Sequence, residues 1–209
     1  MNVKINWFGL AGGGFTLVVV IASLYVPWWQ ISIGELAKAN VSPVNTNFVF
    51  VLGADKPVSF TVPLLWAVTI VGLLFLLTSG IVMLLYSILP SKSYSKHLLV
   101  FAYKKPLFTV IFFIIPLIAV PLILQAILKI AIPLNGTSTI AIPAGFLGGG
   151  VTVSFLISAG FLWPFYLGIV AAGLCIAARL YHKRIVPPTP STAPLLEITT
   201  AAPQTAPTV

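Results

Sequence analysis

Four long apolar stretches constrain this chain more than any other feature of its sequence. A helix that crosses the hydrocarbon core of a bilayer needs about 20 mostly apolar residues. Four segments meet that length without an Asp or a Glu, at about Trp7–Val26, Leu64–Leu89, Leu107–Ile132 and Leu162–Tyr181. Only 7% of the residues are charged, whereas soluble domains carry about 25%. The sequence therefore predicts a membrane protein built on a bundle of four transmembrane helices.

The basic residues are distributed unevenly between the two ends of this bundle. One side has eight of them, Lys4, Lys92, Lys96, Lys104, Lys105, Arg179, Lys183 and Arg184, and the other has only Lys38, Lys56 and Lys129. Because Lys and Arg concentrate in cytoplasmic loops, we expect both termini and the Pro90–Pro106 loop to be cytoplasmic. Residues 27–63 and 133–161 then form outer loops of a multi-pass protein of the cell membrane.

The net charge of +8 is explained by this anchoring at helix ends, so no nucleic-acid partner is expected. In the Pro90–Pro106 loop, Leu98, Leu99, Phe101 and Tyr103 can lie in the interface while the neighbouring lysines face lipid phosphates. Contact with the lipid bilayer and its anionic headgroups is predicted, although nothing in the sequence indicates a specific lipid site.

The outer loops contain short segments rich in β-branched and aromatic residues. These segments are 30–34, 47–53 and 58–62 in the first loop, and 137–142 and 151–158 in the second. Since an isolated hairpin is only marginally stable, we expect strands of both loops to pair in one small antiparallel β-sheet. A fifth helix over Ile142–Trp163 is the alternative, but its five glycines disfavour a helix.

The two ends of the chain have different predicted roles. The first apolar stretch is interpreted as a retained helix rather than a cleaved signal peptide, because Pro27, Trp28 and Trp29 follow it instead of small residues. Residues 1–184 form the membrane domain. Residues 185–209 form a Pro- and Thr-rich cytoplasmic tail that is expected to be disordered, although its composition also resembles O-glycosylated outer stalks.

Small residues at four-residue spacing mark two helix-packing faces, Gly9 with Gly13 and Gly168 with Ala172. Such pairs allow two helices to approach closely. They fit packing within the chain, with self-association or contact with another membrane protein as the alternative.

No residue pattern in the sequence supports catalysis, a cofactor or a metal. Gln125 and Lys129 share one face near the outer end of the third stretch, where an intramembrane polar contact competes with simple anchoring. His97, His182 and the single Cys175 are too scattered for a haem or zinc site. Two sequons, at Asn40 and Asn135, fall in the outer loops and are possible glycosylation sites.

The Trp28-Trp29 pair that ends the first helix begins a long outer loop. With four helices and a sheet from both outer loops, this arrangement resembles the claudin/peripheral-myelin-protein group over about Trp7–Arg184. That group carries a Trp-Gly-Leu-Trp motif and two loop cysteines, which this chain lacks. The resemblance implies a non-enzymatic structural, adhesion or assembly role. An accessory subunit of a membrane complex, such as a respiratory oxidase, is the alternative, followed by a small channel or transporter.

Overall fold

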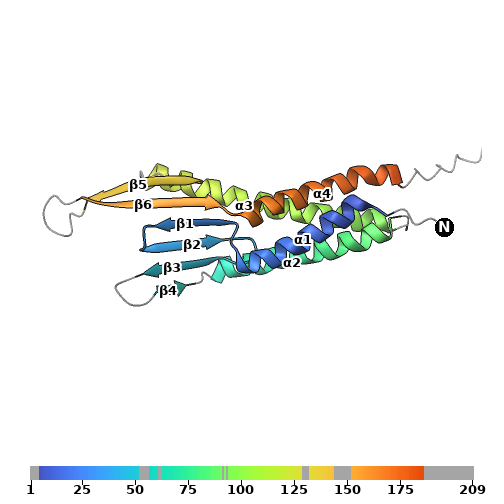
Figure 1. Ribbon diagram of the computed structural model, residues 1–209, viewed down its shortest axis with the longest axis horizontal. Helices are drawn as coiled ribbons and strands as arrows, with labels where there is room; N and C mark the ends of the chain where they lie inside the picture. The colour runs from blue at the N-terminus through green and yellow to red at the C-terminus, as the bar shows by residue number, and fades with distance from the viewer. Residues whose placement is uncertain are drawn as a thin grey trace, which may run out of the picture.

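A bundle of four helices and an antiparallel sheet at one end of it make up the fold (Figure 1). The computed structural model describes residues 5–51, 57–60, 63–90, 92, 94–128, 132–143 and 152–185. The helices are α1 (Trp7–Tyr25), α2 (Pro63–Ile88), α3 (Ser95–Leu128) and α4 (Trp163–Ile185). All four are long and apolar enough to cross a membrane. The start of α1 and the end of α4 lie at the end of the bundle away from the sheet (Figure 1).

Helix α3 begins at Ser95, so the predicted Pro90–Pro106 loop was wrong over most of its length. A proline inside a helix cannot donate to the carbonyl four residues earlier, which for Pro106 is the carbonyl of Ala102. The hydroxyl of Ser79 on α2 donates to that carbonyl at 2.6 Å. Because the neighbouring helix supplies the missing donor, α3 continues through Pro106.

The sheet contains strands from both of the loops that were predicted to lie outside, residues 27–63 and 133–161, and the pairing of the two loops in one sheet is confirmed. Its strands are β1 (Trp29–Ile33), β2 (Ala37–Val41), β3 (Asn47–Val51), β4 (Pro57–Phe60), β5 (Gly136–Pro143) and β6 (Thr152–Phe161). Their order is β4-β3-β2-β1-β6-β5, with antiparallel pairing throughout. The two loops meet where β1 pairs with β6, from Trp29 opposite Phe161 to Ile33 opposite Ile157. Strand β6 also excludes the alternative of a fifth helix.

Strand β2 was not predicted, because Ala, Lys and Asn have low strand propensity. Backbone pairing with both β1 and β3 compensates for this weak propensity. The turn that reverses the chain after β1 places Gly34 at φ +50°, a conformation that glycine adopts without strain.

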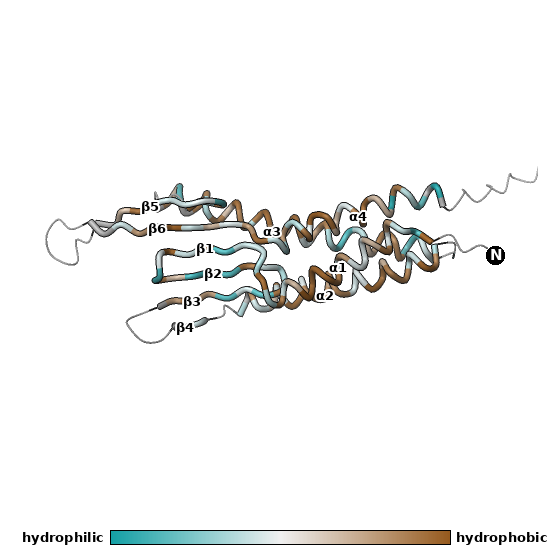
Figure 2. The backbone as a smooth tube through the Cα atoms, in the orientation of Figure 1, coloured by the Kyte–Doolittle hydropathy of each residue, from teal (hydrophilic) through white to brown (hydrophobic). Residues whose placement is uncertain are grey.

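The junction between bundle and sheet is organised around Trp28. Its indole is fully buried, and its ring contacts Phe113 of α3 and Phe165 of α4 edge-to-face. The indole Nε1–H donates to Ser23 Oγ at 2.7 Å, so the one polar atom of the ring is satisfied. Hydropathy follows this division, with apolar residues running along the helices and polar ones gathering on β1, β2 and the far helix ends (Figure 2).

Candidate functional site

The sheet has one apolar face and one polar face. Strand register places Ile31, Ala39, Phe48, Phe60 and Ala159 in one row across it. The next row, on the opposite face, contains Ser32, Lys38, Val49, Ser59 and Ser158. Along the apolar face, exposure increases from 2% at Ile157 on β6 to 52% at Val58 on β4. The β4 side of the sheet therefore presents apolar surface to its surroundings.

The two sequon asparagines differ in their environment. Asn40 lies within β2 opposite Gln30. Its Oδ1 is buried without a hydrogen-bond partner among the described residues, beside a small cavity lined by Tyr25, Pro27 and Asn45. Asn135 precedes β5 and is exposed. Of the two predicted glycosylation sites, Asn135 is the more accessible in the folded chain.

The predicted packing residues Gly9 and Gly13 lie against α2. A Cβ atom built on Gly9 would lie 2.5 Å from Ser87 Oγ, and one on Gly13 would lie 2.9 Å from Leu84 Cγ. The two glycines therefore serve packing within the chain.

The second pair, Gly168 and Ala172, is buried in α4 and does not pack against Gly9 and Gly13. A Cβ on Gly168 would meet the Trp28 indole at 2.8 Å, whereas the contact of α1 with α4 passes through Gly12 beside Cys175. Gly168 thus makes room for Trp28, and Ala172 belongs to the same apolar cluster.

The polar pair predicted near the outer end of the third apolar stretch is described only in part. Gln125 is an exposed residue of α3. Lys129 lies outside the described residues, as does the tail beyond Ile185.

A buried polar network joins three helices at the end of the bundle away from the sheet, which we call the basic end because Arg179 and Arg184 of α4 lie there. Asn6, which is fully buried, accepts from the Gly9 N–H as the N-cap of α1. Its Nδ2 donates to Tyr86 Oη at 2.9 Å and to the Ala178 carbonyl at 3.0 Å. Tyr86 Oη also shares a 2.8 Å hydrogen bond with His182 Nδ1. The network fixes the relative positions of α1, α2 and α4, and sequence reasoning missed it because its partners are far apart in the chain.

Beside this end, the first turns of α3 and the middle of α2 form an open groove that contains both basic and aromatic side chains. This α2–α3 groove has a volume of about 630 Å³ and is lined by Phe75, Lys96, His97, Val100, Phe101, Lys104, Lys105 and Phe108. All but Phe75 belong to α3. The sequence contained a signal for it, since Phe101 and Lys105 are one helical turn apart, but Pro106 made the segment look like a loop.

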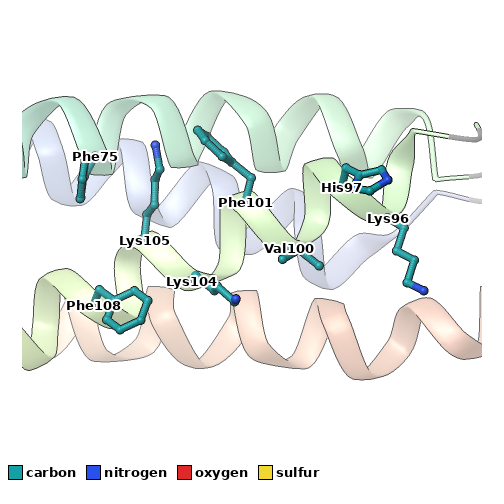
Figure 3. Close-up of a pocket in the computed structure, with 8 residues that line it drawn as sticks. All are labelled: Phe75, Lys96, His97, Val100, Phe101, Lys104, Lys105 and Phe108. Atoms are coloured by element: carbon teal, nitrogen blue, oxygen red, sulfur yellow. The ribbon is translucent and has the colours of Figure 1, made fainter.

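Lys105 lies between the two aromatic rings of the groove. Its Nζ is 3.6 Å from the centroid of Phe101 and 4.8 Å from that of Phe75, and it donates to Thr78 Oγ1 at 3.4 Å. Figure 3 shows Lys105 extending between Phe75 and Phe101, with Lys104 and Lys96 on the other flank of α3. Cation–π contact and the hydroxyl together hold the ammonium group at an otherwise apolar level of the helix.

The described residues contain no group of three or more His, Cys, Asp or Glu side chains that could hold a metal ion. Comparison with known protein families and with curated proteins finds no match to this chain. The function proposed below therefore rests on the structure of the chain itself.

Proposed function

We propose that this chain is a multi-pass integral membrane protein that acts without catalysis, in a structural, adhesion or assembly role. The observation that carries the membrane assignment is the apolar outer surface of the bundle. Phe112 of α3, Ile127 of α3 and Leu180 of α4 are 70–72% exposed, and exposed apolar side chains occur on all four helices. Exposure of such a large apolar surface to water is unfavourable, whereas lipid chains in a bilayer solvate it.

Two regions support contact with a second membrane protein or a second copy of this chain. Helix α3 reaches the junction at Phe113, which contacts Trp28. It then continues to Leu128, roughly 22 Å further at 1.5 Å per residue, to the level of the sheet along the long axis (Figure 1). Val120, Leu122 and Ile123 are exposed on this segment. This segment of α3 and the β4 side of the sheet are two separate apolar regions, together called the outer apolar surface, through which we propose that a partner is bound.

The likeness to the claudin/peripheral-myelin-protein group supports the same kind of role at the level of topology. Four helices and a single sheet from both outer loops are common to the two. The signature of that group is not shared, because this chain has Trp28-Trp29 in place of its motif and its single cysteine, Cys175, is buried in α4.

The packing of the bundle bears on the other candidate functions. A pore along the α1–α2–α4 interface is disfavoured, because fully buried side chains fill the space between these helices: Met83, Tyr86, Cys175 and Ala178.

An accessory role in a membrane enzyme complex would place the outer apolar surface against a catalytic subunit. Purification in mild detergent separates the possibilities, because co-isolation of haem- or metal-bearing subunits would favour the accessory role.

Orientation can be tested by cysteine labelling, for which the buried Cys175 gives a low background. We expect a membrane-impermeant maleimide to label Ser59→Cys on the sheet only from outside and Lys92→Cys only from the cytoplasm. Labelling of both variants from one side would contradict the proposed topology. Release of the chain from membranes by alkaline carbonate would contradict membrane insertion itself.

A further inference from the structure

We propose that the α2–α3 groove binds an anionic phospholipid, with the phosphate held by the groove lysines and the acyl chains lying along its aromatic residues. This inference rests on the proposed membrane insertion. It specifies a site for one lipid class, beyond general contact of basic residues with a charged bilayer surface.

The first argument is the arrangement of charge in two neighbouring rows of side chains on α3. Lys96, Val100, Lys104 and Phe108 follow one another at four-residue steps, and His97, Phe101 and Lys105 form the adjacent row. Side chains at this spacing lie on the same face of a helix. Lys96 and Lys104 are exposed and lie two turns apart, about 12 Å along the helix. The side chains of two lysines at this spacing are long enough to converge on one phosphate group between them.

The second argument is that the charge is not neutralised by the described part of the protein. The chain has only three acidic residues, Glu35, Asp55 and Glu197. Of these, only Glu35 is described, and it lies in the turn between β1 and β2, at the opposite end of the molecule (Figure 1). Lys105 is satisfied by two rings and a hydroxyl, and no described carboxylate faces the groove. An anionic ligand would supply the missing charge.

The third argument is the apolar part of the lining. Phe75, Phe101 and Phe108 are each more than one-third exposed on the outer surface of the bundle, where lipid chains would contact them. A soluble anion would gain nothing from these rings, and a purely apolar molecule would gain nothing from the lysines. A phospholipid satisfies both. The groove volume of about 630 Å³ also falls within the ordinary range of small-molecule sites, roughly 300–1,000 Å³.

The position of the groove agrees with this ligand. It lies at the end of the bundle that carries Arg179 and Arg184, which is the end we assign to the cytoplasmic leaflet. Anionic lipids concentrate in that leaflet, and basic pockets between helices at this level are suited to their headgroups.

Native mass spectrometry of the full chain in detergent micelles tests the site, because it counts bound lipids individually. The probes are phosphatidylglycerol and phosphatidylcholine with identical acyl chains. We expect wild type to bind phosphatidylglycerol at least tenfold more tightly. In Lys96→Gln/Lys104→Gln, which removes two exposed charges of the groove, phosphatidylglycerol binding should weaken roughly 30-fold, since each basic residue near an anionic lipid contributes about a fivefold factor.

The matched control is Lys92→Gln/Arg184→Gln, which removes two exposed charges at the same end but outside the groove. It should retain the preference for phosphatidylglycerol. Phe108→Ala should weaken binding of both lipids a few-fold without removing charge. Soluble glycerol 3-phosphate, which has the phosphate but no chains, should compete only at a concentration at least a hundredfold higher than the lipid.

Equal affinity for the two lipids, an equal loss in the control pair, or competition by glycerol 3-phosphate at lipid concentrations would each overturn the proposal. Carbonate extraction of the same variants distinguishes failure of the proposed lipid site from failure of the proposed membrane function. A chain that stays in the membrane without a preference for the anionic lipid contradicts only the site, whereas a chain released by carbonate contradicts membrane insertion.

Discussion

The Ser79 hydroxyl on α2 donates a 2.6 Å hydrogen bond to the Ala102 carbonyl on α3, the carbonyl that Pro106 leaves without its helical donor. Both residues are fully buried. This contact lets α3 continue past the proline, so that Lys96, Lys104 and Lys105 before it and Phe108 after it lie on one continuous helix. The shape of the α2–α3 groove thus depends on a hydroxyl outside its lining.

We expect Ser79→Ala to lower the free energy of unfolding by about 1–3 kcal/mol, the usual cost of leaving a buried polar group unsatisfied. Denaturation by SDS in mixed micelles measures this. Pro106→Ala restores an N–H that can bond to Ala102, so Ser79→Ala should cost less in that background, with a coupling of roughly 1 kcal/mol. An equal cost of Ser79→Ala in both backgrounds would show that the hydroxyl does not compensate for the proline.

This pair also shows the limit of prediction from sequence. Helices α1, α2 and α4 were predictable because their apolar runs are long and end at recognisable breaks. The start of α3 was not, because a Pro is a valid stop signal unless a donor from another helix replaces the lost N–H. The donor, the hydroxyl of Ser79, lies 23 residues from the Ala102 carbonyl in the chain, and no local sequence pattern identifies it.

The same reasoning applies to the sheet and the polar network. The β-branched and aromatic segments predicted most of the strands, but β2 forms through its neighbours on both sides rather than through its own propensity. Asn6 was not predicted to belong to a polar network. Its contacts with Tyr86 and Ala178 span 80 and 172 positions, so they became visible only in the fold.

Close approach of α1 and α2 at Gly13 gives a second prediction. A Cβ at this position would lie 2.9 Å from Leu84 Cγ and 3.0 Å from the Gly80 carbonyl oxygen, which is backbone and cannot rotate away. We expect Gly13→Ala to destabilise the protein by about 1–3 kcal/mol.

Gly14 is the matched control, because a Cβ there has nothing within 4 Å. Gly14→Ala should be neutral or stabilising by up to about 1 kcal/mol through helix propensity. The same SDS titration reports both variants. If Gly13→Ala proved as harmless as Gly14→Ala, the tight contact between α1 and α2 would be wrong.

The three-helix network at the basic end gives a third prediction. Asn6→Ala removes the N-cap of α1 and the hydrogen bonds to Tyr86 and Ala178. We expect a loss of about 1–3 kcal/mol in the free energy of unfolding. Asn45→Ala removes an exposed amide and should change stability by no more than about 0.5 kcal/mol. Similar effects of the two substitutions would argue against a structural role for the network.

Adjacent residues of β6 give the last prediction, which tests the register of this strand in the sheet. Ile157 points to the apolar face and is 2% exposed, whereas Leu156 points to the opposite face and is 54% exposed. Ile157→Ala should lower the free energy of unfolding by about 2–5 kcal/mol, because it leaves a cavity in a packed face. Leu156→Ala should cost less than about 1 kcal/mol. Successive residues of a strand point to opposite faces of the sheet, so equal costs, or a larger cost for Leu156→Ala, would contradict the register in which β6 pairs with β1.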